Sequence, residues 1–146
     1  MTEPKELDFI WRLNDYINTL DLYAKSNVGI LDVGDSISLL AMPGGNEIIF
    51  HDGTRDKDYQ IQINAKSKDQ LKCIDALSKI SKELEGLESG AIQSNNDTFD
   101  FENIRTTSFV SIIMQDEHGY FLYQVSLSAK ITIYGEWYKW LEKRML

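Results

Sequence analysis

Apolar positions recur with a helical period in two stretches of the chain. The first stretch predicts an amphipathic helix from Pro4 to Tyr23, because its apolar residues follow one another at steps of mostly three and four residues: Phe9, Ile10, Leu13, Ile17 and Leu20. In the second stretch, Ser67 to Gln70 has the form of a capping box. The helix predicted after it ends at Gly86 or Gly90 and buries one stripe: Leu71, Ile74, Leu77, Ile80, Leu84 and Leu87.

A period of two predicts strands elsewhere. Residues Tyr59 to Lys66 alternate between apolar and polar side chains, and Phe121 to Tyr134 do the same over a longer run. The segment from Phe99 to Met114, with a nearly continuous apolar run at its end, is predicted to pair with the second run through the turn Asp116 to Gly119. Weaker patterns favour short strands at 28–31, 37–41 and 48–50, followed by an exposed loop at 51–58.

Together these elements predict an α+β fold, a mostly antiparallel sheet with helices packed on one face. We expect a single domain spanning residues 1–146. The tail at 135–146 places Trp137 and Trp140 on one helical side, and it is expected to dock either on its own domain or on a neighbouring subunit. The strand Phe121 to Tyr134, longer than its expected partners, is a candidate for pairing with a neighbour.

The charge of the chain argues against some classes of binding partner, nucleic acids above all. The formal net charge is −8, and residues 1–58 hold eleven acidic and five basic side chains. Phosphate binding needs clustered Lys and Arg, which the sequence lacks, so we expect no specific nucleic acid binding. We also expect no contact with a membrane and no signal peptide. The lone Cys73 fits a reducing compartment, which makes a cytoplasm the expected place of synthesis.

Candidate chemistry is sparse. His51 and His118 are the only histidines, and both fall in predicted turns or loops. A single Cys and two scattered His lack the spacing of zinc ligands, and the acidic cluster at 52–58 does not match a calcium loop. Since no nucleotide-binding motif occurs either, we expect no cofactor, no metal and no enzymatic activity.

The second half of the chain carries a resemblance to a known family. The strand at 59–67 leads into a helix that contains Gln70-Leu71, Ala76-Leu77, Ile80 and Leu84. This unit resembles the strand–helix unit of phage minor capsid proteins related to tail terminators and head-to-tail joining proteins. The Phe101 strand, the hairpin around Gly119 to Tyr123 and the first helix also lie where that family has similar elements.

The resemblance implies a structural virion protein of a long-tailed bacteriophage or prophage. Such a protein forms a hexameric ring at the head–tail junction, contacts the tail tube protein and the head connector, and leaves a passage for DNA. It implies surface contacts in the loop from Gly44 to Asp58 and in the turn from Asp116 to Gly119, and the C-terminal aromatic residues are further candidates. The candidate interface residues are Arg55, Asp56, Lys57, Asp58, Asp116, Glu117, His118, Trp137 and Trp140.

Two alternatives stay open from the sequence. A monomeric bacterial protein-binding module, of the chaperone or immunity kind, has the same strong patterning and the same lack of catalytic residues. An enzyme with an unrecognised site requires His51 or His118 to lie in a concave pocket beside a carboxylate.

Overall fold

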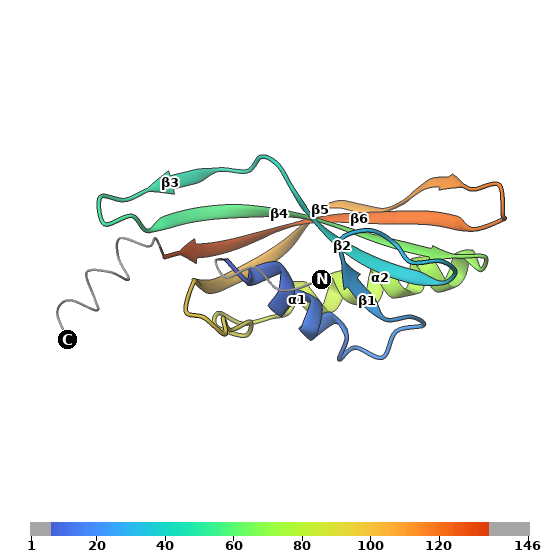
Figure 1. The fold of residues 1–146 in the computed structure, drawn as a ribbon, viewed down its shortest axis with the longest axis horizontal. Helices are drawn as coiled ribbons and strands as arrows, with labels where there is room; N and C mark the ends of the chain where they lie inside the picture. The colour runs from blue at the N-terminus through green and yellow to red at the C-terminus, as the bar shows by residue number, and fades with distance from the viewer. Residues whose placement is uncertain (1–6, 135–146) are drawn as a thin grey trace.

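Strand β4 (Arg55–Ser67) lies at the centre of the fold and pairs antiparallel with β6 (Phe121–Ile133) along its whole length. The computed structural model of the chain describes residues 7–134 (Figure 1). Along the chain the remaining elements are α1 (Phe9–Ile17), β1 (Ser26–Val28), β2 (Ser36–Met42), β3 (Glu47–Ile49), α2 (Gln70–Glu85) and β5 (Phe99–Gln115).

The six strands formed by the described residues make one open sheet. Its order is β1-β2-β4-β6-β5, and β3 pairs with β4 beside the far end of β2. All pairs are antiparallel except β1 with β2. One edge of the sheet is therefore formed by β5, and the other by β1 and β3.

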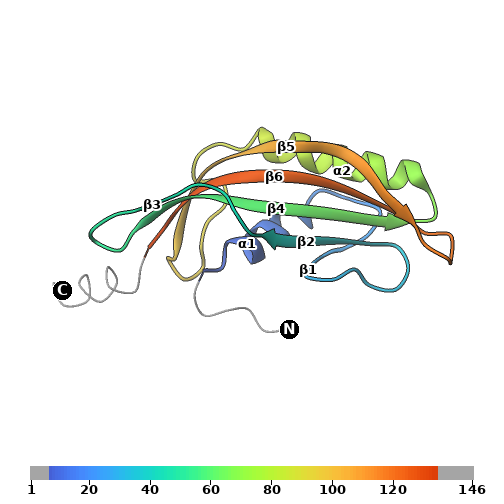
Figure 2. The same cartoon turned by 90° about the horizontal axis from the view of Figure 1, so that it is seen from above.

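Both helices lie on the same face of the sheet, as Figures 1 and 2 show. The apolar residues of β4 and β6 that alternate toward this face form one continuous core with the helices. Its largest fully buried side chains are Phe9, Leu13, Ile17, Ile37, Leu39, Ile61, Ile63, Leu77, Ile80, Leu84, Leu127 and Ile131. The predicted α+β class, with helices on one face of a mostly antiparallel sheet, is confirmed.

The first helix is shorter than the predicted span from Pro4 to Tyr23. It begins at Phe9 and ends at Ile17, and the side chain of Asn18 turns away to bond the backbone of Ser26. Tight turns follow, and Asp21 has a φ of 56°, which a helix does not allow. Leu20 still packs into the core from outside the helix, and this explains why the apolar period continued past its end.

The second helix is capped two residues later than the capping box predicted. Asp69, not Ser67, accepts a hydrogen bond from the backbone N–H of Leu71 at 3.0 Å, and Ser67 Oγ instead accepts one from Asp69 N. The predicted stripe is buried from Leu77 to Leu84, but Leu71 is 67% exposed because it lies in the first turn, on the outer side. Gly86 ends the helix as expected.

Two predictions about the strands are wrong. The expected loop at 51–58 becomes part of β4 from Arg55 onward, because its backbone pairs with β3 on one side and β6 on the other. The strand at 121–134 is not an edge that a neighbour can extend, since β6 lies between β4 and β5 and both its sides are occupied. The longer strand is β5, and it forms the edge.

The buried and exposed leucines of α2 make a matched test of the core. Leu77→Asp places a charge at a fully buried position, and we expect the loss of cooperative folding, since unpaired buried charge costs several kcal/mol. Leu71→Asp makes the same change at an exposed position of the same helix and leaves the unfolding free energy within about 0.5 kcal/mol of the parent value. Urea unfolding followed by circular dichroism measures both, and a cooperative Leu77→Asp variant contradicts the assigned helix face.

A buried carboxylate ties the start of α1 to the loop before β5. Asp8 accepts hydrogen bonds from Ser94 Oγ at 2.7 Å, from Asn95 N at 2.9 Å and from Thr98 Oγ1 at 3.0 Å. Burial raises the pKa of the Asp8 carboxyl, but these donors outweigh it and hold the pKa below its usual value. The charged form therefore stabilises the folded chain.

This contact predicts a pH dependence. Asp8→Asn removes the charged acceptor, and we expect a loss of about 1–3 kcal/mol of unfolding free energy at neutral pH. Because the folded pKa is lowered, the parent loses this contribution as the pH falls below about 4, so the two unfolding curves converge there. Asp75→Asn, at an exposed position of α2, is the control and changes little. A constant gap between parent and Asp8→Asn down to pH 2 contradicts the assignment.

Candidate assembly interface

The interface residues predicted from the sequence form two groups at opposite ends of the sheet. Arg55 to Asp58 begin β4, level with Ile133 at the end of β6. Asp116 to His118 form the turn between β5 and β6, next to the other end of β4 at Ser67. Twelve residue steps along an extended strand separate the ends by about 40 Å. The structure therefore does not bring the two groups together (Figure 1).

Side chains of the first group are partly used within the chain. Asp56 accepts a hydrogen bond from Thr132 Oγ1 at 2.9 Å across the β4–β6 pair. Arg55 is paired with Glu47 of β3 at 3.0 Å. Asp58 lies opposite Lys130 in the register. These pairs explain how a charged segment is held in a strand, with charges of opposite sign across from one another.

Both hairpin turns are organised by an aspartate. Asp52 Oδ1 accepts from the backbone and the hydroxyl of Thr54 in the β3–β4 turn. Asp116 Oδ1 accepts from the backbone N–H groups of Tyr120 and His118, each at 2.9 Å, and these donors lower the pKa of its carboxyl. Asp116 thus shapes its turn, whereas Glu117 and His118 point into solvent with 88% and 75% of their side chains exposed. Trp137 and Trp140 lie outside the described residues.

The middle of the sheet face opposite the helices is polar along β4 and β6. Gln60 donates to Ser128 Oγ at 2.9 Å, Gln62 donates to Asn64 Oδ1 at 3.0 Å, and Gln62 also bonds Gln124. These polar contacts, within β4 and across to β6, follow the polar half of the alternation in the two strands. No helix covers this face in the part of the chain that the structure describes (Figure 2).

Apolar side chains gather on the two edges of the sheet, a feature that the sequence analysis missed. On β5, Phe109 is 85% exposed, and Ile112, Ile113 and Met114 are about half exposed. On the other edge, the β3 segment exposes Ile48, Ile49 and Phe50. Ten successive residues from Thr106 to Gln115 carry no charge, which is unusual for an exposed edge and is visible in the sequence.

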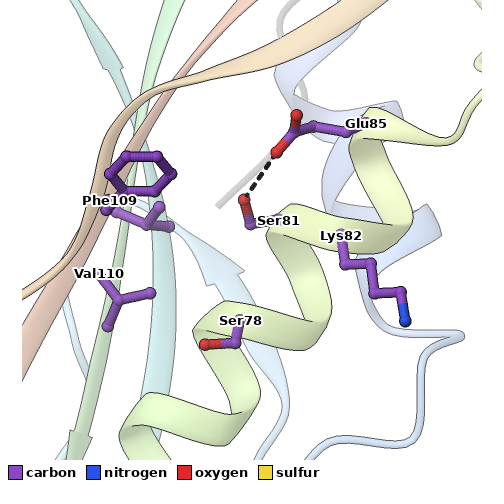
Figure 3. A pocket seen from close by; sticks show the side chains of 7 residues that line it. Ser78, Ser81, Lys82, Glu85, Phe109 and Val110 are labelled. Carbon is purple, nitrogen blue, oxygen red and sulfur yellow. Dashed lines mark hydrogen bonds between the residues drawn. The ribbon is translucent and has the colours of Figure 1, made fainter.

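A groove separates β5 from α2 beside this edge, as Figure 3 shows. Phe109 and Val110 form its strand side, and Ser78, Ser81, Lys82 and Glu85 line its helix side. Thr106 and Ser81 bond Glu85 and each other at its end. The groove therefore exposes apolar contact area from β5 beside polar side chains of α2.

The histidines do not meet the condition for a catalytic site. His118 is 3.7 Å from Glu117, but the pair lies on an exposed turn and not in a concave pocket. His51 is exposed in the β3–β4 turn. Over residues 7–134, no group of three or more His, Cys, Asp or Glu side chains is arranged to hold a metal ion. No helix within these residues is long and apolar enough to cross a membrane.

The two roles in the β5–β6 turn can be separated by substitution. Asp116→Ala removes the acceptor of two backbone hydrogen bonds, so we expect the turn to loosen and the unfolding temperature to fall. His118→Ala, two residues away and exposed, leaves stability within about 0.5 kcal/mol of the parent. Thermal unfolding measures both, and equal effects of the two substitutions contradict the role given to Asp116.

Comparison with known proteins gives the chain a family. A model of the bacteriophage tail terminator protein family matches residues 16–133. No curated protein sequence matches the chain. Among solved structures, the fold is similar to a chain in the virion of a native gene transfer agent particle. The identity is 10%, the TM-score is 0.46, and 82% of this chain and 84% of that chain are covered. On the family match, the chain belongs to the bacteriophage tail terminator family and is a structural, non-catalytic protein of the phage particle.

Proposed function

We propose that the chain acts as one domain that assembles into a hexameric ring at the head–tail junction, where it stops polymerisation of the tail tube and joins the tail to the head connector. The observation that carries this proposal is the match of the tail terminator family over residues 16–133, which include every described strand.

The shape of the sheet supports two separate contacts along the ring axis. The β3–β4 hairpin and the β5–β6 turn project from opposite ends of the sheet (Figure 1). Arg55 to Asp58 adjoin the first end, and Glu117 and His118 occupy the second. A ring of such subunits presents one hairpin on each rim, so one rim contacts the tail tube and the other the connector. Trp137 and Trp140 are proposed as further contacts with a neighbouring subunit.

The polar sheet face suits the wall of a DNA passage. Its amides are bonded to one another through Gln60, Gln62 and their partners on β6. The cations on this face of β4, β5 and β6 are Lys66, Arg105 and Lys130, and Asp56 and Asp58 lie on the same face beside Lys130. Carboxylates among so few cations weaken phosphate binding, so DNA slides past this face.

Tails assembled without their terminator provide the test. We expect the purified chain to bind such tails at one end, to stop further addition of tube protein, and to restore joining to filled heads. Electron micrographs measure tail length, which changes from variable to uniform, and the number of joined particles. The Leu77→Asp variant serves as the negative control, because it lacks the folded domain.

Two results together contradict the proposal. These are a chain that stays off the tail ends and tails that keep growing in its presence. In that case the monomeric protein-binding module becomes the better account, and a search for a single soluble partner follows.

A further inference from the structure

We propose that neighbouring copies of this chain join edge to edge: β3 of one copy pairs antiparallel with the distal half of β5 of the next copy, at residues 106–115. The inference deepens the proposed ring, on which it rests, by naming the two surfaces that meet. It follows from where the sheet edges are closed and where they are open.

The β5 edge is closed over its first part only. Gly90 N donates to the carbonyl of Phe101 at 2.9 Å, and Gln93 bridges to Asp100, so the loop before β5 covers this end. Beyond it, from Thr106 to Gln115, no described strand pairs with the outer side of β5. This open part is also the uncharged, apolar part, whereas monomeric proteins usually protect such edges with charge or proline.

The opposite edge shows the same division. At β1, the side chain of Asn18 accepts from Ser26 N at 2.7 Å and donates to Ser26 O at 2.9 Å. The amide thus takes the hydrogen-bonding groups that a further strand would use, and α1 closes this part of the edge. No described strand covers the outer side of β3, and Ile49 there is 62% exposed. The two open edges are therefore distal β5 and β3.

The side chains of the two open edges match face by face. Ile49 is paired with Arg55 and points toward the helix side of the sheet, where β5 exposes Phe109 and Ile112. Ile48 is paired with Asp56 and points to the uncovered side, where β5 exposes Met114. Pairing the edges places apolar side chains together on both faces and satisfies backbone groups at the same time.

The topology also fixes direction and offset. Both β1 and β3 run antiparallel to β4, and β5 runs parallel to it, so β3 of a neighbour meets β5 in the antiparallel sense. Strand β1 lies one strand further from β4 than β3 does. If the neighbouring copy stood at the same height along the strands, its β1 would therefore occupy the position of β5 of the first copy. A shift of about eight residues, roughly 27 Å, removes this clash and brings β3 onto residues 109–114.

Such an offset is what a closed ring of tilted strands requires, since closing a sheet needs staggered registers. The contact joins two different surfaces, so it repeats head to tail and closes at a defined number of copies. The bulges of β5 leave only short regular stretches for pairing, which suits a three-residue partner strand.

Mixing two blocked variants tests the pairing. Variant A carries Phe109→Lys and Ile112→Lys on β5, and variant B carries Ile48→Lys and Ile49→Lys on β3. The changed side chains are all exposed, so both variants should keep the parent unfolding midpoint. Val33→Lys, at a fully exposed apolar position away from both edges, is the matched control. Sedimentation at the concentration where the parent is a ring gives the masses.

We expect A alone and B alone to be monomers, with at least tenfold weaker self-association than the parent. Their mixture should give a one-to-one dimer and nothing larger, because β3 of A can still pair with β5 of B. The control should form the parental ring.

Three results overturn the inference. One is dimerisation of B alone, which means that β5 pairs with β5; another is parental assembly by both variants. The third is a parent that stays monomeric at its highest soluble concentration. A chain truncated after Tyr134 separates the tail from the edges: loss of assembly there, with A and B unaffected, assigns the contact to residues 135–146. If variants A and B still form rings and cap tails, this inference is wrong and the proposed function stands. If the parent forms rings through these edges but does not cap tails, the proposed function is wrong and this inference stands.

Discussion

The pairing of backbone groups along the edges of one sheet is the constraint on which the rest of the structure depends. A strand at an edge leaves N–H and C=O groups that must meet water, a side chain or another chain. This protein closes two stretches itself, with the amide of Asn18 at Ser26 and with the loop before β5 at Phe101. The stretches that it leaves open are those that expose apolar side chains.

The same constraint separates the roles of the surfaces. The helices close one face of the sheet and supply the core, while the opposite face bonds its amides to one another through Gln60 and Gln62. The ends of the sheet are compact hairpin turns held by Asp52 and Asp116. The ring that we propose needs contacts along its axis, contacts between neighbouring copies and a passage for DNA. The ends, the edges and the polar face offer one surface for each.

The sequence predicted the core better than the edges, for a physical reason. Strand β6 and the buried part of α2 could be predicted because one side of each is buried, which imposes a strict period on the apolar residues. The polar pattern at 55–58 predicts a loop because both faces of this segment meet solvent, and only backbone pairing with β3 and β6 makes it a strand. The order of strands depends on long-range pairing, so β6 was wrongly expected at an edge and β5 was missed there. The uncharged run at 106–115 is the feature of the sequence that could have indicated an open edge at β5.

Hydrogen–deuterium exchange of the assembled ring against a monomeric edge variant tests the central claim most directly. The account predicts that the outward-facing amides of two segments, 106–115 of β5 and 47–50 of β3, exchange quickly in the monomer and become protected together on assembly. The covered start of β5 at Phe101 should be protected in both states. Unchanged exchange in both segments upon ring formation would contradict the account.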